Sequence, residues 1–585
     1  MERNRDDSRA AIAQTVEAIW REVLNRDAAD PQDNFFDLGG NSLGVVKFLA
    51  QIEDSLGLDV LMPEELYQTP TLSAVVSTIE SRVRRADSSF PGGTIAEVFA
   101  ERAAEAPEAI ALRFRDRAVT YRELDRAAND LAWRLHREGV KPGTVVATAM
   151  ARTPEFVAAL LGILKAGGAY LPIDPGWPAA RLATMTDLAS VPVVVTDEAT
   201  DAPLPDHVTR MRVGATDAAG RDDGPDVEVA AAGAAIVNFT SGSTGEPKGV
   251  LTPHHGVTSL LFPAAYTELS ADTVLLQHMS PSFDAMTIEL WGALLHGGTC
   301  VLFDGMFPSV SRLRAAIYDN GVNTLVLTTA LFNVIVDSAP DLLDPLVALI
   351  LGGEAQSPRH IRAAHERLPK LPIINAYGPT ETTVIATCFP VAELAADASS
   401  VPIGRPIAHR EVSILGPDLT PVAPGETGEI CVSGPGLSIG YVGRPDLTDE
   451  RFITIRTEDG RPRRIYRTGD LARVNPAGEM EFLGRADRQV KLNGQRIELE
   501  EIERALEAHP GVLQAVALVH GEGVTRTLQA VLVAPDGVPD DLRRVLSRSL
   551  PDYMIPMGVR AIDTLPLTTN GKVDRAALTE LLDQV

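Results

Sequence analysis

From Thr94 onward, alanine-rich stretches with helical spacing alternate with short runs of β-branched and aliphatic residues. The clearest of these runs are Thr144–Ala149, Val191–Val195, Ala235–Phe239, Thr324–Leu327 and Leu346–Ile350. Parallel strands need long crossover connections, which are usually helices, so this alternation is typical of α/β proteins. At 585 residues and 45% hydrophobic content, the chain is long enough for about three to four domains with large buried cores. We therefore predict an α/β fold with largely parallel sheets over this region.

Residues 1–85 follow a different pattern, which predicts a separate small helical bundle. Apolar residues recur there at helical spacing, and a polar stretch ending in Pro-Gly-Gly follows. Four helical segments are expected, at Ala10–Leu24, Leu43–Leu56, Pro63–Tyr67 and Thr71–Val83. Residues 86–93 are interpreted as the linker to the larger part of the chain.

The segment Asp37–Leu43, DLGGNSL, stands just before the second expected helix. Ser42 is therefore predicted at or near a helix N-terminus. An attached phosphodiester would meet unpaired N–H groups and the positive end of the helix dipole there. The alternative from the residues alone is that Ser42 only caps the helix.

The segment Asn238–Val250, NFTSGSTGEPKGV, places hydroxyl residues and glycines in one short loop. Backbone N–H groups of such a loop can turn toward a polyphosphate, and glycines leave room for close approach. The loop is not a Walker P-loop, because Lys248 is not followed by Ser or Thr. Taken alone, a loop of this composition is more often a turn. The phosphate-binding candidates are Thr240, Ser241, Gly242, Ser243, Thr244, Gly245 and Lys248.

Four further motifs follow this loop in the chain. They are NAYGPTETT at Asn375–Thr383, YRTGDLAR at Tyr466–Arg473, GRADRQVKLNGQRIELEEIE at Gly484–Glu503 and TTNGKVDR at Thr568–Arg575. Together with the loop, they resemble the adenylation domains of nonribosomal peptide synthetases, within the adenylate-forming enzyme family. FFDLGGNSL in front of them resembles the attachment motif of a peptidyl carrier domain.

This resemblance implies a multidomain fold. A small four-helix carrier bundle would be followed by an α/β adenylate-forming fold, which has a large N-terminal core and a small mobile α+β C-terminal subdomain. The expected boundaries are 1–85 for the carrier, 94–486 for the core and 487–585 for the C-terminal subdomain. The implied activity is ATP-dependent formation of an aminoacyl-AMP and transfer of the aminoacyl group to a carrier thiol.

The chemistry explains the residue types. A substrate carboxylate attacks the α-phosphate of ATP, and because both partners are anionic, positive groups and N–H donors must neutralise the developing charge. By resemblance, Lys572 contacts the carboxylate and the α-phosphate, and Glu381 binds Mg²⁺. Asp470 would accept hydrogen bonds from the ribose, and Tyr377 would stack on adenine. The other nucleotide-binding candidates are Gly353, Glu354, Asn375, Ala376, Gly378, Thr380 and Arg485.

The resemblance also implies a moving C-terminal subdomain with its hinge at Asp487. One pose would bring Lys572 to the adenylate. The other pose would withdraw Lys572 and admit the carrier thiol beside Lys491, so that one pocket serves two reactions in turn.

Asp284, in SFDAMTIELWG, is expected to pair with the α-ammonium group of an amino acid. Without the resemblance, a helix cap would be the commoner role for such an aspartate. The side-chain site is predicted from apolar positions at Ala285, Ile288, Val326, Ile350, Gly352, Ala376, Val384 and Ile385. Such a site rejects charged substrates because nothing in it could pair with their charge. We expect a neutral hydrophobic L-amino acid, first leucine, valine or isoleucine, with phenylalanine and tryptophan left open.

Composition narrows the partners. A net charge of −26 argues against nucleic-acid binding, which needs a basic surface. The N-terminus has no apolar segment typical of a signal peptide, no apolar run is long enough for a membrane helix, and Cys300, Cys388 and Cys431 fit no metal-binding spacing. These features predict a cytoplasmic protein with reduced cysteines.

The expected cofactors are ATP, Mg²⁺ and 4′-phosphopantetheine on Ser42. The expected partners are a phosphopantetheinyl transferase and downstream or in-trans carrier and condensation proteins, while the need for an MbtH-like helper stays open. Because the carrier motif precedes the adenylation motifs and no condensation pattern fits the remaining length, we expect a compact loading or tethering protein. Loading of Ser42 in cis and of another carrier in trans both stay open.

Two other functions fit parts of the sequence. An acyl- or aryl-CoA ligase with a fused carrier would not need Asp284, and would use free CoA as acceptor. A non-catalytic scaffold would not need Lys572, Asp470 and Glu381 together. The residues favour amino-acid adenylation over both.

Overall fold

The computed structural model describes two units, Met1–Pro91 and Gly92–Val585. The described residues are 16–24, 26, 28, 30, 33–40, 44–45, 47–49, 51–52, 66, 70–76, 93–198, 200–214, 220–241, 247–264, 266–305, 309–456, 461–492, 494–521, 525–566 and 573–583. The candidates Ser42, Gly242, Ser243, Thr244, Gly245 and Lys572 lie outside them.

The first unit is helical around an aromatic centre. Residues 16–24 and 72–76 are helical, as are the described residues between 44 and 52. The Trp20 ring packs edge-on against Phe35 and Phe48, with centroids 5.2 and 5.6 Å apart. Such pairs stabilise a small core beyond their buried area alone. These residues agree with the predicted helical unit, and its division into four helices stays a prediction.

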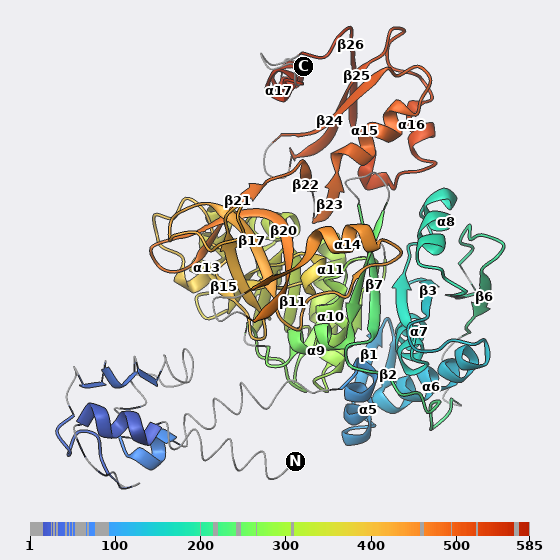
Figure 1. Cartoon of the computed structure of the whole chain (residues 1–585). Helices are drawn as coiled ribbons and strands as arrows, with labels where there is room; N and C mark the ends of the chain where they lie inside the picture. The colour runs from blue at the N-terminus through green and yellow to red at the C-terminus, as the bar shows by residue number, and fades with distance from the viewer. Residues whose placement is uncertain are drawn as a thin grey trace. The chain divides into compact units, whose positions relative to one another are not determined.

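Two large sheets organise the second unit (Figure 1). One has the strand order β15-β14-β13-β12-β11-β9-β10-β1-β2, and the other has the order β18-β8-β7-β4-β3-β5-β6. The strands of the first sheet are β1 (Ile110–Phe114), β2 (Arg117–Thr120), β9 (Val274–Gln277), β10 (Thr299–Leu302), β11 (Thr324–Thr328), β12 (Ala348–Gly352), β13 (Ile373–Tyr377), β14 (Thr387–Pro390) and β15 (Arg405–Pro406). Those of the second are β3 (Val145–Ala149), β4 (Ala169–Pro172), β5 (Val193–Thr196), β6 (Thr209–Arg212), β7 (Ala234–Thr240), β8 (Lys248–Pro253) and β18 (Gly440–Tyr441).

The predicted parallel α/β architecture is confirmed in both sheets. The five β-branched runs named above form β3, β5, β7, β11 and β12. Strands β9 to β13 are parallel neighbours, and so are β3 to β7 along their sheet. Antiparallel pairs occur at the margins, as in β1–β2, β13–β14 and β7–β8.

Helices pack between and around these sheets. The largest core joins side chains of α5, α6, α7, α9 and α10 to strands of both sheets. Two of these helices begin at capping boxes, where Thr94 pairs with Glu97 and Thr120 with Glu123. The helices of the second unit with its sheets are α5 (Ile95–Glu105), α6 (Tyr121–Arg137), α7 (Pro154–Lys165), α8 (Ala179–Leu188), α9 (His254–Leu261), α10 (Met286–Leu294), α11 (Val310–Asn320), α12 (Thr329–Ser338), α13 (Pro358–Arg367) and α14 (Pro445–Arg451), with 3₁₀ turns η1 (Pro340–Leu343), η2 (Thr380–Thr382) and η3 (Val391–Glu393).

A third sheet leads into the C-terminal lobe. Its order is β16-β17-β20-β19, with β21 paired to β20. The strands are β16 (Glu411–Leu415), β17 (Gly428–Ser433), β19 (Phe452–Arg456), β20 (Pro462–Val474) and β21 (Met480–Arg485). The hairpin of β22 (Gln489–Leu492) and β23 (Gln495–Glu498) follows directly, and we refer to it as the β22–β23 hairpin.

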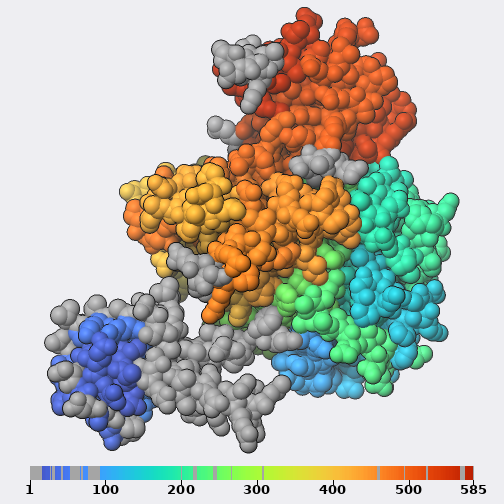
Figure 2. Space-filling view, viewed as in Figure 1, coloured from blue at the N-terminus to red at the C-terminus, as the bar shows by residue number. Residues whose placement is uncertain are grey.

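The C-terminal lobe is an α+β unit built on a three-stranded sheet. Its elements are α15 (Leu499–Glu507), β24 (Gln514–His520), β25 (Thr527–Val533), α16 (Leu542–Leu546), η5 (Asp552–Met554), β26 (Gly558–Ile562) and α17 (Arg575–Asp583). Figure 1 shows these elements gathered in one lobe that the chain reaches through β22 and β23. The space-filling view places this lobe against the rest of the second unit (Figure 2). Within the described parts of the chain, no helix has the length and apolar character needed to cross a membrane.

Candidate active site

Three adjacent parallel strands build the floor of the site. Val326 on β11 pairs with Ile350 on β12, which pairs in turn with Ile374 on β13. Side chains alternate between the faces of a strand, so these residues share a face, and Ala376 shares it two residues after Ile374. The neighbouring leucines of β11 and β12 belong to a different core on the other face. Ligands of parallel α/β sheets bind beyond the carboxyl ends of the strands, where this apolar floor ends.

A cavity of about 520 Å³ lies at this edge. Its size is in the range of small-molecule sites in proteins. All nine positions predicted to contact the substrate line it: Asp284, Ala285, Ile288, Val326, Ile350, Gly352, Ala376, Val384 and Ile385. Val326 belongs to no recognised sequence motif, and strand β11 brings it to the cavity.

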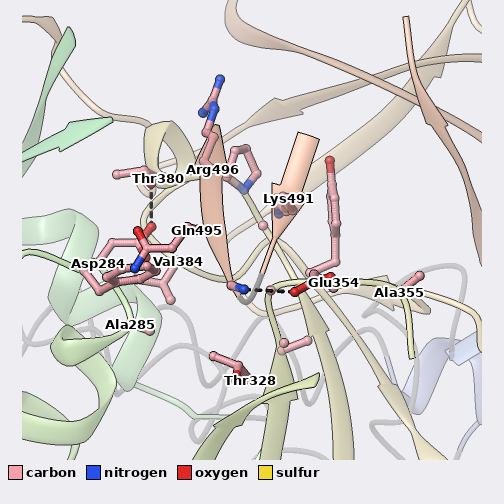
Figure 3. Close-up of a pocket in the computed structure, with 18 of the residues that line it drawn as sticks. Asp284, Ala285, Thr328, Glu354, Ala355, Thr380, Val384, Lys491, Gln495 and Arg496 are labelled. Atoms are coloured by element: carbon pink, nitrogen blue, oxygen red, sulfur yellow. Dashed lines mark hydrogen bonds between the residues drawn. The ribbon is translucent and has the colours of Figure 1, made fainter. Parts of the chain in front are cut away.

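Asp284 supplies a carboxylate beside this apolar surface. It lies just before α10, where its backbone carbonyl accepts a hydrogen bond from the Thr287 N–H. Its side chain accepts a 2.6 Å hydrogen bond from the Thr380 hydroxyl (Figure 3). Burial raises the pKa of Asp284, although the bond from Thr380 and the charge of Lys491 oppose this shift. A cationic ligand group would therefore find a poorly solvated carboxylate in the cavity.

The loop after η2 places Val384 and Ile385 in the cavity. Thr383 and Val384 both have left-handed backbone angles, with φ of 58° and 67°. A β-branched residue rarely adopts this conformation, which costs on the order of 1–3 kcal/mol per residue. The fold holds it in place through the Thr383 hydroxyl, which donates a 2.8 Å hydrogen bond to the Gly436 carbonyl. The neighbouring Gly378 is also constrained, because a Cβ there would lie 2.5 Å from the Val384 carbonyl oxygen.

Asp470, Tyr377 and Arg485 form a second polar cluster on the cavity wall. The Asp470 carboxylate accepts hydrogen bonds from the Tyr377 hydroxyl and the Arg485 guanidinium. Register explains the second contact, because Asp470 on β20 is directly opposite Arg485 on β21. Among the other nucleotide candidates, Thr240, Ser241, Gly353, Glu354, Asn375, Ala376, Gly378 and Thr380 also line the cavity.

The hydroxyl- and glycine-rich loop joins two antiparallel strands. Thr240 ends β7 and pairs across the sheet with Lys248, which begins β8. Lys248 is 9% exposed at its side chain, and its Nζ lies 3.9 Å from Glu381 and 4.0 Å from Glu498. Burial, with Arg496 adding to it, lowers the pKa of Lys248 to about 8 against the opposing effect of the two carboxylates. Neither Lys248 nor Glu381 is among the residues that line the cavity, although both lie beside residues that do.

Glu381 does not fit a magnesium ion in this arrangement. Its carboxylate is fully buried, and its oxygens lie 3.1 and 2.9 Å from the Arg496 guanidinium. The Tyr441 hydroxyl donates a further 2.7 Å hydrogen bond. Burial alone would raise the pKa of Glu381, but Arg496 and Lys248 hold it well below its usual range. Among the described residues, no group of three His, Cys, Asp or Glu side chains is placed to hold a metal.

The β22–β23 hairpin closes the cavity from the C-terminal side. Lys491 and Arg496, from its two strands, both line the cavity (Figure 3). The Glu354 carboxylate accepts a 2.9 Å hydrogen bond from the backbone N–H of Gly494 at the hairpin turn. Burial lowers the pKa of Lys491.

Asp487, the expected hinge, lies just before this hairpin. Its carboxylate accepts hydrogen bonds from the Arg485 guanidinium and from the backbone N–H of Gln489. Its role as a hinge stays a prediction, as do the domain boundaries at residues 86, 94 and 487.

The sequence analysis did not predict that Arg496 and Arg526 form ion pairs with carboxylates at the site. Arg496 lies inside a motif that was recognised, but no pattern assigned it to Glu381, 115 residues earlier. Arg526 forms a 2.9 Å ion pair with Glu354 from a part of the chain without a motif. The only available signal was the position of Arg496 close to the expected hinge.

A buried polar network supports the loop that carries Asp284. The Glu289 carboxylate on α10 is fully buried, accepts a 3.2 Å hydrogen bond from the Met279 N–H and lies 3.4 Å from His278. The His278 ring also lies 2.9 Å from the Val326 carbonyl. Burial raises the pKa of Glu289 to about 8, with Arg152 opposing the shift, and lowers that of His278 to about 4. The network ties the Asp284 loop to the floor of the cavity.

Comparison with known proteins agrees with this geometry. Residues 99–442 match the family described as AMP-binding enzyme, over more than half of the chain. The chain belongs to the AMP-binding enzyme family. Residues 501–572 match the AMP-binding enzyme C-terminal domain, and residues 14–79 match the phosphopantetheine attachment site.

Curated relatives of this AMP-binding enzyme are peptide synthetases. Tyrocidine synthase 3 of Brevibacillus parabrevis is 39% identical over 83% of this chain, and bacitracin synthase 1 of Bacillus licheniformis is also 39% identical over 83%. The chain spans only 8% and 9% of these two relatives. The shared segment is therefore a small part of these much longer proteins, while the carrier and adenylation parts of this chain are identified by the family matches.

Solved structures match most of the chain. Holo-PA1221, described as a nonribosomal peptide synthetase protein containing adenylation and PCP domains, is 35% identical with a TM-score of 0.78, over 84% of each chain. Klebsiella oxytoca NpsA, solved with 3-hydroxyanthranilyl-AMSN, is 29% identical with a TM-score of 0.62, over 84% of this chain and 99% of that one. The cofactors of these families are ATP, Mg²⁺ and 4′-phosphopantetheine, as predicted.

Proposed function

We propose that this AMP-binding enzyme activates a neutral hydrophobic L-amino acid with ATP and passes the aminoacyl group to a carrier thiol. The observation that carries the proposal is the half-buried carboxylate of Asp284 at the edge of an apolar cavity, where desolvation raises its pKa. An acid without an amino group would leave this carboxylate with only the more distant charge of Lys491, which is costly at a poorly solvated site. An α-ammonium group would supply the missing positive charge.

The apolar floor of the cavity favours a substrate with a hydrophobic side chain. Val326, Ile350 and Ile288 are almost completely buried and offer no hydrogen-bonding group to a ligand. A charged or strongly polar side chain would lose its hydration there without replacement. One methylene changes binding by only about 1–3 kcal/mol in such a pocket, so leucine, valine and isoleucine compete closely.

The first half-reaction joins the substrate carboxylate to the α-phosphate. A carboxylate oxygen forms the new P–O bond, and the bond to the pyrophosphate leaving group breaks. We assign Lys572 to stabilise the transferred charge, Asp470 to bind the ribose and Tyr377 to contact adenine. Thr240, Ser241 and Lys248 would face the phosphates, as would the loop residues Gly242 to Gly245.

The second half-reaction needs a thiol. A carrier-bound 4′-phosphopantetheine, either on Ser42 or on another carrier in trans, supplies the thiol that takes the aminoacyl group as a thioester while AMP leaves. Lys491 faces the cavity where this attack would occur, and rotation about Asp487 would exchange it for Lys572. The partners that this role implies are a phosphopantetheinyl transferase and downstream or in-trans carrier and condensation proteins, and the exchange assay below tests the need for an MbtH-like helper.

The test is ATP–pyrophosphate exchange with the full-length protein. The panel contains the twenty proteinogenic amino acids, the deaminated analogues of the hydrophobic ones, and aryl and fatty acids, each with and without a co-expressed MbtH-like protein. We expect exchange with one hydrophobic amino acid and little with its deaminated analogue. Exchange with an aryl or fatty acid alone would instead support a fused acyl-CoA ligase and refute the role of Asp284.

A further inference from the structure

Arg410 is a buried arginine for which the described part of the chain offers no carboxylate at ion-pairing distance. It lies just before β16, after a turn in which His409 has a left-handed backbone with φ of 61°. Only 5% of Arg410 is exposed, and burial lowers its pKa to about 10, so that its charge is retained near neutral pH. A buried charge is costly unless its surroundings compensate it. The contacts of the guanidinium therefore have to account for an arginine at this position.

The guanidinium of Arg410 joins two segments of the fold. Its Nη1 donates a 2.9 Å hydrogen bond to the Ser259 hydroxyl, and its Nη2 donates a 3.4 Å hydrogen bond to the Gly256 carbonyl, both on α9. It also lies directly against Gly436, where an added Cβ would overlap the guanidinium carbon. Arg410 therefore spans from α9 to the segment that contains Gly436.

The same two glycines border the side chain of Thr383. The Thr383 hydroxyl donates its 2.8 Å hydrogen bond to the Gly436 carbonyl. A Cβ added to Gly256 would lie 2.7 Å from the Thr383 hydroxyl oxygen, which is too close for an ordinary contact. Because Arg410 contacts both glycines, it fixes the spacing of the slot that Thr383 occupies.

The slot determines the course of the backbone into the cavity. Val384 and Ile385 follow Thr383 directly and line the cavity, where Val384 is labelled in Figure 3. The left-handed backbone at Thr383 and Val384 is unfavourable for β-branched residues, so contacts elsewhere must impose it. The Ile385 N–H donates a 2.8 Å hydrogen bond to the Thr383 carbonyl, so a displacement of Thr383 would reach the cavity wall.

We propose that Arg410 is a positioning residue for the substrate cavity and acts through Thr383. It holds Gly256 and Gly436 at a fixed spacing and thereby fixes Thr383 between them. The turn then sets how far Val384 extends into the cavity, and so the width available to a substrate side chain. This effect on selectivity rests on the proposed function, whereas the fixed turn needs no substrate.

Arg410→Met separates positioning from a merely structural role. Methionine has a similar length and no donor, and its introduction leaves no buried carboxylate without a partner. The Gly256 carbonyl also keeps the 2.9 Å hydrogen bond from the Ser259 hydroxyl. We therefore expect the Tm of Arg410→Met to stay close to that of wild type while the turn at Thr383 loosens.

Hydrogen–deuterium exchange of the full-length protein without substrate measures the turn directly. The amides of Thr383 and Ile385 are read, since both donate backbone hydrogen bonds in this turn, and the amides of β3 in the other large sheet are the reference. Arg410→Met should speed exchange of the turn amides by on the order of tenfold and leave those of β3 unchanged. Arg410→Lys should restore only part of the protection, because an ammonium group lacks the planar fork that reaches both segments.

ATP–pyrophosphate exchange then measures the effect on the cavity. In Arg410→Met, KM for the preferred amino acid should rise by on the order of tenfold, while KM for ATP stays within about twofold. The preference for this amino acid over its homologue with one more methylene should fall by about fivefold, because the cavity width is no longer fixed. Arg134→Met is the matched control, because Arg134 also donates to a backbone carbonyl, that of Arg212 at 2.6 Å, and neither residue lines the cavity.

A double-mutant cycle tests whether Arg410 acts through Thr383. Thr383→Val removes the hydroxyl that bonds the Gly436 carbonyl and should reproduce the loss of selectivity. The double variant should then lose no more than the larger of the two single losses. Additive losses would overturn the inference.

Two further outcomes would overturn it in a folded Arg410→Met: unchanged exchange of the turn amides, or an equal rise of KM for the amino acid and for ATP. If Arg410→Met does not fold, Arg410→Lys carries the same comparison, and wild-type amide exchange together with wild-type selectivity in that variant would overturn the inference. Failure of every amino acid in the exchange panel would refute the proposed function and leave the hydrogen-exchange result to decide the role of Arg410 in the turn.

Discussion

Asp284→Ala is the sharpest perturbation of the proposed substrate site. Asp284 is a half-buried, poorly solvated carboxylate held by the Thr380 hydroxyl, so its removal would leave a bound α-ammonium group without a counter-charge. Breaking a buried pair by removing one partner costs about 3–5 kcal/mol. Each 1.4 kcal/mol is a factor of about ten, so kcat/KM for the amino acid should fall by roughly 10²-fold to 4 × 10³-fold.

The assay compares two substrates with the same side chain. ATP–pyrophosphate exchange is measured with the preferred amino acid and with its deaminated analogue, in wild type and in Asp284→Ala. The variant should lose activity with the amino acid and should keep or gain activity with the analogue, because only the first carries the ammonium group. Equal losses with both substrates, or no loss with either, would refute the reasoning.

The same residue predicts a stability effect with a defined sign. Burial raises the pKa of Asp284 in the folded protein above that in the unfolded chain. The folded state then binds more protons, so the contribution of Asp284 to the free energy of unfolding falls as pH rises above the unfolded pKa. Asp284→Asn should therefore leave Tm equal or higher at pH 7 in the absence of substrate. A clear drop in Tm would mean that the carboxylate stabilises the fold.

Four further variants test separate parts of the proposal. Lys572→Ala should slow adenylate formation by on the order of 100-fold or more in ATP–pyrophosphate exchange, and wild-type rates would exclude Lys572 as the catalytic lysine. Asp487→Pro should keep adenylate formation and block thioester formation, and equal loss of both would argue against a hinge at this residue. Burial raises the pKa of Glu289 from 4.5 to about 8, so the contribution of Glu289 to the free energy of unfolding falls as pH rises between these values. The Tm of Glu289→Gln should therefore depend less on pH in this range than the Tm of wild type. Equal slopes of Tm against pH in the two proteins would contradict this. Ser42→Ala should abolish the mass increase that a phosphopantetheinyl transferase and CoA produce in wild type, and a retained increase would place the attachment elsewhere.

Local patterns predicted much of the second unit. The β-branched runs that form β3, β5, β7, β11 and β12 could be predicted as strands, because a buried parallel strand is a short, nearly continuous apolar segment. The Thr94 and Thr120 capping boxes, which were not among the predictions, are equally local and place two helix starts within four residues of sequence. Motifs predicted that Asp284, Tyr377 and Asp470 belong to one site, and all three line the cavity.

Other features depended on contacts between distant segments. The sequence offered no sign that Arg526 would pair with Glu354, 172 residues away. The left-handed backbone at Thr383 and Val384 was equally hidden, because β-branched residues disfavour that conformation and only the surrounding fold imposes it.

The sequence by itself determined the family, the α/β class and the chemistry of the candidate site, because motifs and strand periods are encoded over a few neighbouring residues. Only the tertiary structure decided how the charges of that site are paired. Glu381 carries the residue type of a magnesium ligand, yet in this fold it is paired with Arg496, 115 residues further along the chain. The reason is physical, since a buried charge must take whichever opposite charge the fold brings within reach, and sequence spacing does not record that distance.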